Sequence, residues 1–359
     1  MRKIWFALAL LTSHFAFAQP QGYYNSALGL NGNPLRLALY NIIKNATQLT
    51  YTPGLWNAYY TTDVHPGTNK VWDIYSDNPN GTAAYYYILG SNQCGNGASH
   101  ENSCYNREHI WPQSKFGSKY PMYSDLWIAY PTDYYINGQR SNMPYGTVGT
   151  ATQTFTNGTK IGNNIATGAP ATNCFEPIDS FKGDIARSYF YIVTRYLADS
   201  NNFSSWEMAS GINLQPWAIQ LLLAWHHLDP VSKKEKDRND AAYAIQQNRN
   251  PFIDFPIFAD CIWGTSNCSS LSIPNIGLTS SFTIFPNPAH QVAHLQLPES
   301  TLSQLQSAEF LNLQGQVLWK KENGFTTDEN IDLSAFAKGM YWIRLRTSNN
   351  VLVTKLAVD

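Results

Sequence analysis

The chain has 359 residues, enough for more than one domain with a well-buried core. Its 24 Lys and Arg residues are balanced by 25 Asp and Glu residues, giving a formal net charge of −1. This balance excludes the chain-wide basic field on which strong non-specific nucleic-acid binders rely, but it is compatible with an enzyme that has a local basic cleft.

The N-terminus is typical of a secretory signal peptide. A basic start at Arg2 and Lys3 precedes an apolar run from Ile4 to Phe17 and a small-residue cleavage pattern at 16–18. The apolar run is too short to span a membrane, which takes about 20 apolar residues, and no other segment of the sequence qualifies. We therefore expect residues 1–18 to be removed and the mature protein to be soluble and exported.

A helix and two strands are predicted after the signal. Apolar residues recur at helical spacing over Pro34–Gln48. The segments Lys70–Tyr75 and Ala83–Leu89 are rich in aromatic and β-branched residues, and a turn-forming stretch at 77–81 separates them. These patterns predict an amphipathic helix followed by two strands.

The five cysteines are interpreted as disulfide candidates because an exported protein meets oxidising conditions. Cys94 and Cys104 flank a Gly- and Asn-rich loop, and closing so short a loop stabilises the fold by roughly 2 to 3 kcal/mol. Cys261 and Cys268 are near enough in sequence to form a second bridge, which leaves Cys174 over. The sequence lacks the paired spacings typical of zinc ligands, so a zinc site is not expected.

The stretch from Asn106 to Ser114 places a carboxylate, Glu108, directly beside an imidazole, His109. A hard cation such as Mg²⁺ binds a few carboxylate or amide oxygens and keeps several waters. A neutral imidazole nearby can deprotonate an attacking water at neutral pH. The pairing therefore favours a one-metal phosphodiesterase. We expect the motif to lie on a strand and a helix to follow within 125–137.

Three further helices are predicted. Apolar residues mark one face of Phe181–Asp199, and Leu214–Leu228 is apolar nearly all round, as in a buried helix. The sequence from Ser232 to Glu235 is a capping-box pattern that opens a helix running towards Arg249. The pair His226–His227 adjoins the buried helix and is interpreted as structural.

The composition changes at 265–281, where Ser, Thr, Asn, Gly and Pro indicate a linker. Alternating β segments follow, and we expect them to form a small β-sandwich over 282–359. The predicted strands cover Val292–Leu297, Ala308–Trp319 and Tyr341–Val358, the last broken by a turn at 348–350.

Tyr105 to Ser114 resembles the signature of the bacterial endonuclease I family, which comprises secreted, sugar-nonspecific nucleases with a ββα-metal active site. Other segments resemble this family in the same order, and the likeness covers most of 23–263. Those segments are 71–76, 130–133, 137–142 and 248–252. The resemblance implies an α+β fold, with a ββα-metal nuclease domain and several surrounding helices over 19–264.

The C-terminal segments Phe285–Pro288 and Lys338–Trp342 resemble the sorting domain of the bacterial type IX secretion system. The resemblance implies that residues 282–359 are an export label recognised by that machinery. The protein is then expected to be secreted, whether released or held at the cell surface.

The family resemblance assigns roles to three residues. Glu108 and Asn137 would hold one Mg²⁺, with Mn²⁺ or Ca²⁺ as alternatives, and His109 would be the general base. Without the resemblance, Glu108 could be an ordinary strand glutamate, His109 a core histidine and Asn137–Gly138 a turn. The base must be neutral, so with an unperturbed pKa of about 6.5 activity is expected to fall on acidification.

Arginines and an asparagine complete the predicted site. Arg140 could bind a phosphate oxygen bidentately or brace the site through Asp133, while Asn142 is expected near the phosphate. Arg107 is expected to orient the carboxylate and imidazole, with substrate contact as the alternative. Arg249 could line the nucleic-acid cleft or be a helix C-terminal cation.

The predicted function is that of a secreted, Mg²⁺-dependent, monomeric endonuclease. It would cleave DNA, with RNA as a further substrate, show little sequence specificity, and leave 5′-phosphates. One alternative is a catalytically silent nucleic-acid-binding or adhesive protein on a nuclease fold. Another is a phosphodiesterase that acts mainly on RNA.

Overall fold

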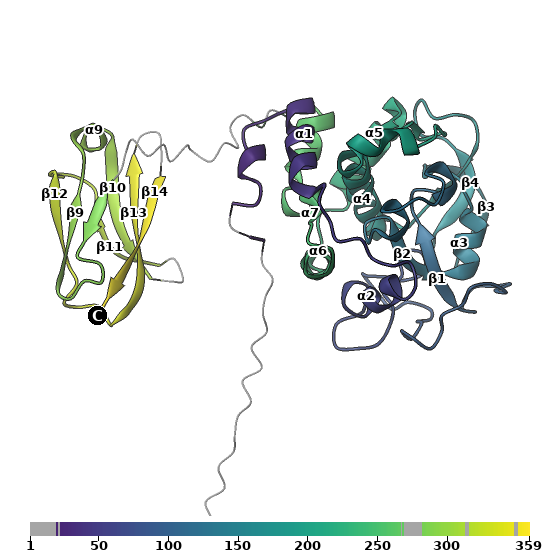
Figure 1. The fold of residues 1–359 in the computed structure, drawn as a ribbon, viewed down its shortest axis with the longest axis horizontal. Helices are drawn as coiled ribbons and strands as arrows, with labels where there is room; N and C mark the ends of the chain where they lie inside the picture. Colours follow the sequence, from purple (N-terminus) through teal and green to yellow (C-terminus); the bar gives the residue numbers. More distant parts are fainter. Residues whose placement is uncertain (1–18, 21, 267, 269–281, 313–315, 348–350) are drawn as a thin grey trace, which may run out of the picture. The chain divides into compact units, whose positions relative to one another are not determined.

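The computed structural model describes residues 19–20, 22–266, 268, 282–312, 316–347 and 351–359. The expected signal peptide at 1–18 and most of the expected linker at 265–281 lie outside the described residues. The chain forms two compact units, residues 1–270 and 271–359 (Figure 1). None of the described helices is long and apolar enough to cross a membrane.

The first unit combines helices with short antiparallel sheets around one aromatic-rich core. Its helices are α1 Gly32–Ile43, α2 Gly54–Thr62, α3 Tyr134–Arg140, α4 Lys182–Arg195, α5 Pro216–Leu228, α6 Lys233–Gln246, α7 Pro251–Asp254 and α8 Ile257–Trp263. Its strands are β1 Tyr105–His109, β2 Ala129–Asp133, β3 Val148–Thr154, β4 Lys160–Asn164, β5 Asn173–Glu176, β6 Ala209–Ser210 and β7 Asn213–Leu214.

The ββα unit is built from β1, β2 and α3. The Glu-His motif lies on β1, as predicted, and β1 pairs antiparallel with β2 so that Glu108 faces Tyr130. The predicted helix within 125–137 begins only at Tyr134, because the preceding residues form β2. Pro131 is tolerated there because it sits in a two-stranded sheet, where each strand needs its N–H groups on one side only.

The prediction of strands at 70–75 and 83–89 was wrong. The two segments meet through isolated contacts, including a hydrogen bond from Val71 N to Tyr87 O, but they form no continuous ladder. Their apolar side chains, such as Val71, Tyr75 and Leu89, are buried in the core. The aromatic and β-branched composition of these segments therefore reflects their burial and not a strand conformation.

Helix α4 is the centre of the first unit. It packs against α1, α5 and α7, and every residue of it except Asp184 is buried, so the expectation of a single apolar face was too narrow. In Figure 1 it lies between α1 and the β1–β2 pair. Helix α5, in contrast, leaves Gln220, Ala224 and Leu228 exposed and is not buried all round.

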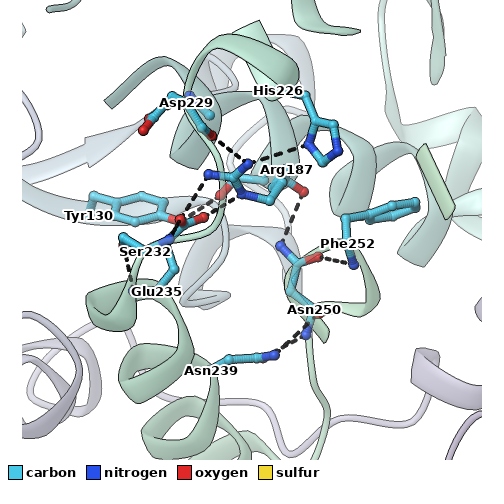
Figure 2. Close-up of polar contacts among 11 residues, drawn as sticks. Tyr130, Arg187, His226, Asp229, Ser232, Glu235, Asn239, Asn250 and Phe252 are labelled. Carbon is cyan, nitrogen blue, oxygen red and sulfur yellow. Dashed lines mark hydrogen bonds and ion pairs between the residues drawn. The ribbon is translucent and has the colours of Figure 1, made fainter. Parts of the chain in front are cut away.

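A buried polar network joins the central helix to the helices that follow it (Figure 2). The Arg187 guanidinium on α4 donates to both Glu235 oxygens, at 2.5 and 2.8 Å, and to Asp229 O at 2.9 Å. The predicted capping box is present, with Ser232 and Glu235 bonding each other's backbone at the start of α6. His226 is buried at the edge of this network, which agrees with a structural role.

Both predicted disulfides are present, Cys94–Cys104 and Cys261–Cys268, and Cys174 is a buried free thiol. The first bridge ends one residue before β1. Helix α1 ends at Ile43, earlier than predicted, and Thr47 N then bonds Gln246 O instead of continuing the helix.

The second unit has two sheets with a shared core, as expected for a β-sandwich. One sheet has the order β11-β10-β13-β14 and the other β12-β9-β8. The elements are β8 Thr283–Phe285, β9 Val292–Gln296, α9 Glu299–Leu302, β10 Leu305–Leu311, β11 Val317–Lys321, β12 Asp328–Asp332, β13 Gly339–Thr347 and β14 Val351–Val358. The turn expected at 348–350 lies outside the described residues.

Candidate active site

The ββα unit opens onto a cavity of about 390 Å³. Glu108, His109 and Asn137, which the sequence places in two separate stretches, all line it. The other lining residues are Tyr51, Gly95, Asn106, Arg107, Pro112, Gln113, Tyr134, Gly138, Ser141 and Asn142.

Glu108 is only 3% exposed, and its hydrogen bonds converge on one oxygen. Oε1 accepts from Arg140 Nη1 at 2.6 Å and from the Tyr75 hydroxyl at 2.8 Å. Burial raises the pKa of this carboxyl, although Arg140, Tyr75 and a hydrogen bond from the His109 backbone oppose that shift. None of the described side-chain donors uses Oε2, so this oxygen is the one that can bind a ligand in the cavity.

His109 is held in a defined tautomer. Its Nε2 lies 3.0 Å from the carbonyl oxygen of Tyr123, and a carbonyl only accepts, so Nε2 carries the proton and Nδ1 keeps its lone pair. Burial lowers the pKa of His109 to about 4. The ring therefore stays neutral at pH values well below about 6.5, the pKa of a free histidine. The loss of activity on acidification is then expected at a lower pH than the unperturbed pKa implied.

The rings around His109 fix its plane. Tyr123 stacks on it at 5.2 Å between ring centroids, with an interplanar angle of 7°, and Tyr51 stacks at 5.9 Å and 13°. Two parallel aromatic neighbours and the Nε2 hydrogen bond leave the imidazole little freedom to rotate. Such preorganisation suits a residue that must accept a proton from a defined direction.

Asn137 projects from α3 towards β1. Its Nδ2 donates to Asn106 Oδ1 at 2.9 Å and lies 3.5 Å from Arg107 O. With the amide nitrogen so engaged, Oδ1 is the atom available to the cavity. Gly138 beside it leaves open space, since an added Cβ would meet no heavy atom within 4 Å.

Neither predicted role of Arg140 fits the structure. The side chain is fully buried, and Nη1 and Nη2 bond Glu108 Oε1 and the backbone carbonyls of His109 and Ile110 at 2.6, 3.1 and 2.7 Å. A buried guanidinium with these partners cannot bind phosphate. It does brace the site, but through Glu108 and the end of β1. Asp133 instead caps α3 by accepting from Ile136 N.

Arg107 lies at the rim of the cavity. Nη1 donates to Tyr51 O at 2.6 Å and Thr52 Oγ1 at 2.8 Å, and the guanidinium carbon lies 3.5 Å from the Tyr51 ring centroid. The expected contact with the Glu108 carboxylate is not among its described contacts. Arg107 lies against the ring of Tyr51, which stacks on His109, and its charge adds to the effect of burial in lowering the pKa of His109. None of the described ion pairs involves Arg107.

Arg249 is not part of the cavity. It is 3% exposed and forms ion pairs of 2.7 Å with both Asp240 and Asp254. The helix-end interpretation therefore fits better than the prediction of a role in the cleft. Asn142, in contrast, lines the cavity and is exposed, as a residue near substrate should be.

The sequence did not identify Tyr51, Gln113 and Tyr134 as cavity residues, nor Tyr75 as a partner of Glu108. Aromatic side chains are frequent throughout the chain, so nothing marked these few as different. Tyr75 does lie within the 71–76 segment that resembles the family, and this was the one usable signal.

The donor set fits a hard cation. No cluster of three or more His, Cys, Asp or Glu side chains that could hold a metal occurs within the described parts of the chain. Mg²⁺ needs less, because it keeps several waters and takes one or two protein oxygens. Glu108 Oε2 and Asn137 Oδ1 can supply such oxygens, because the described side-chain hydrogen bonds of the two residues do not use them.

Comparison with known proteins gives matches in both units. Residues 31–257 match the Endonuclease I family, and residues 283–359 match the secretion system C-terminal sorting domain. An extracellular ribonuclease of Bacillus amyloliquefaciens is 34% identical over 253 residues, covering 68% of this chain and 79% of the relative. An extracellular ribonuclease of Bacillus subtilis is 33% identical over 263 residues, covering 71% and 83%.

Proposed function

The chain belongs to the endonuclease I family, and on this basis we propose that it hydrolyses phosphodiester bonds in DNA and RNA with one Mg²⁺ held by Glu108 and Asn137. It is a secreted nuclease with a C-terminal type IX sorting domain. The observation that carries the proposal is the convergence of Glu108, His109 and Asn137 on one cavity.

The residues divide the chemistry between them. Glu108 Oε2 and Asn137 Oδ1 would hold the cation. When bound, Mg²⁺ supplies Lewis-acid stabilisation of the charge that develops on the phosphate and on the leaving 3′-oxygen. His109 accepts a proton from the attacking water at Nδ1, and Nε2 stays bonded to the Tyr123 carbonyl. In-line attack by water then leaves a 5′-phosphate.

Arg107 is the proposed phosphate anchor. Its guanidinium carbon lies 3.5 Å from the ring centroid of Tyr51 and 4.3 Å from that of Trp56, and its described hydrogen bonds use only Nη1. Nε and Nη2 therefore remain for a substrate phosphate oxygen. Asn142 lines the same cavity and can add a neutral donor. Phosphate contacts carry no sequence information, so little base specificity is expected.

The names of the two Bacillus relatives support RNA as a substrate. The proposed nucleophile is water, not the 2′-hydroxyl of the sugar, so the same site would act on DNA. Digestion of matched DNA and RNA strands tests this point. Both should give 5′-phosphate ends, and a 2′,3′-cyclic phosphate from RNA would contradict water attack.

A catalytically silent binding protein is the competing function. Plasmid nicking separates the two: the wild-type chain should nick DNA with Mg²⁺ and stop with chelator. His109→Ala should lower the rate by about 10² to 10⁴-fold. His290→Ala, at an exposed histidine of the second unit, is the matched control and should retain full activity. Cleavage that ignores both chelator and His109→Ala would rule out the proposed mechanism.

A further inference from the structure

The segment Val71–Ser76 resembles the nuclease family together with the catalytic strand, but no step of the proposed mechanism uses it. Its Tyr75 is fully buried beneath Glu108. The Tyr75 hydroxyl donates to Glu108 Oε1 at 2.8 Å and lies 2.5 Å from the hydroxyl of Tyr145, which is also fully buried. Three residues far apart in the sequence are thus joined in one buried chain of hydrogen bonds.

The direction of donation along this chain is fixed. A phenol hydroxyl carries one proton, and that of Tyr75 goes to Glu108. Tyr75 must therefore accept from Tyr145, so protons are donated from Tyr145 to Tyr75 to Glu108. In such a chain each hydrogen bond polarises the next, and Tyr145 makes Tyr75 a better donor.

This chain of hydrogen bonds controls the orientation of the Glu108 carboxylate. The last torsion of a glutamate is intrinsically soft, so a carboxylate needs external partners to hold its plane. Oε1 receives Tyr75 and Arg140 from inside the protein. With Oε1 fixed on the inner side, Oε2 is directed to the cavity that Glu108 lines.

We infer that Tyr75 and Tyr145 are positioning residues of the cation site, holding Glu108 so that Oε2 is ready to bind a divalent ion. The inference rests on the proposed function, because it takes Glu108 as a cation ligand. Neither tyrosine lines the cavity, so both act through Glu108 and not by touching the substrate.

Direct binding of Mn²⁺ to the mature full-length protein, without nucleic acid, tests this inference. The fraction of free Mn²⁺ is read by electron paramagnetic resonance for wild type, Tyr75→Phe and Tyr145→Phe. Loss of a partner that orients a ligand typically lowers metal affinity by 10 to 100-fold, so Tyr75→Phe should raise the Kd about tenfold or more. Tyr145→Phe removes only the polarising bond and should raise it about two- to threefold.

Tyr191→Phe is the matched control. Its hydroxyl is buried and donates to a carboxylate oxygen, Asp125 Oδ2, at 2.9 Å, but it does not contact Glu108. It should lower the Tm while leaving the Mn²⁺ Kd unchanged. The same measurement on Tyr75→Phe separates a loss of stability from a loss of cation binding.

The outcomes are distinct. Folded Tyr75→Phe and Tyr145→Phe proteins with the wild-type Kd would overturn the inference while leaving the proposed function intact. A wild-type protein that binds no Mn²⁺ would overturn the proposed function itself. If Tyr75→Phe does not fold, Tyr145→Phe decides the matter, since it leaves the bond between Tyr75 and Glu108 in place.

Discussion

Two buried arginine–glutamate pairs in the first unit have different chemical roles. Glu108 with Arg140 and Glu235 with Arg187 have closest N–O distances of 2.6 and 2.5 Å, and all four side chains are at most 4% exposed. Glu235 uses both oxygens, since Oε1 and Oε2 accept from Arg187 and Oε2 also accepts from Ser232 N. The described side-chain bonds of Glu108 all end on Oε1.

The difference shows what makes a buried charge functional. Ion pairing and burial are common to both sites, so neither distinguishes a catalytic carboxylate from a structural one. Both oxygens of the Glu235 carboxylate are occupied by these partners, and the carboxylate joins α6 to α4 (Figure 2). The Glu108 carboxylate has its described side-chain donors on Oε1 only, and the residue lines a cavity.

Removing the structural glutamate should have the largest effect on stability. Glu235→Ala leaves the Arg187 guanidinium buried without its charge partner, which typically costs about 3 to 5 kcal/mol. Denaturant unfolding measures this loss. The protein that remains folded should cleave DNA at the wild-type rate. A folded Glu235→Ala protein without nuclease activity would remove the distinction between the two pairs.

Changing the functional glutamate should act on catalysis. Glu108→Gln keeps an acceptor for Arg140 but removes the negative charge that binds a cation. Several kcal/mol of transition-state stabilisation depend on that cation, so we expect kcat/KM to fall about 10²-fold or more. Rates of plasmid nicking over a range of Mg²⁺ concentrations measure the change. An unaltered Mg²⁺ dependence would exclude Glu108 as a ligand.

In each of the two pairs, the sequence predicts the local setting of the glutamate but not its arginine partner. The capping box from Ser232 to Glu235 and the strand carrying Glu108 and His109 follow from local patterns, and both predictions were correct. The arginine partners did not follow, because Arg140 lies 32 residues from Glu108 and Arg187 lies 48 from Glu235. Only the tertiary fold brings them together, through the packing of α3 on β1 and the contact of the Arg187 side chain on α4 with the first turn of α6.

The errors have a common physical cause. The strands predicted at 70–75 and 83–89 and the single apolar face of α4 were inferred from hydrophobicity, which reports burial and not hydrogen-bond pattern. Strand β2 was missed because its residues lie within 125–137, the region in which a helix was predicted. Tyr75 could not be selected from 22 tyrosines until its hydroxyl was located beside Glu108.

The buried network around Arg187 should also make the stability of the protein depend on pH, through His226. Burial, helped by the nearby Arg187, lowers the pKa of His226 to about 4, while Asp260 opposes the shift and His227 adds to it. The unfolded chain, with a pKa near 6.5, then binds more protons than the folded protein between pH 6.5 and 4. Stability is therefore lost as pH falls through this window, by about 2 kcal/mol between pH 7 and 5 from this residue.

His226→Asn isolates that contribution, because the amide oxygen can still accept from Arg187 but does not titrate. The difference in unfolding free energy between pH 7 and 5 should shrink by about 2 kcal/mol relative to wild type. An equal pH dependence in both proteins would show that His226 is not buried in its neutral form.

Smaller effects on activity are expected from substituting Arg107 and Arg249, for which the sequence suggested contact with the substrate. Arg107→Gln removes the proposed phosphate anchor and should raise KM about tenfold, and it should also reduce the slope of log Kd against log salt by about one. Arg249→Gln should leave both unchanged, since Arg249 is paired with Asp240 and Asp254 away from the cavity. Equal effects of the two substitutions on KM would refute the assignment.

The most direct test is a crystal structure of the protein soaked with Mg²⁺. We expect a single cation with Glu108 Oε2 and Asn137 Oδ1 at about 2.0 to 2.1 Å and waters at the remaining positions, beside a His109 ring still bonded to the Tyr123 carbonyl. A cation that binds without both oxygens, or a cavity that takes up none at saturating Mg²⁺, would contradict the proposed active site.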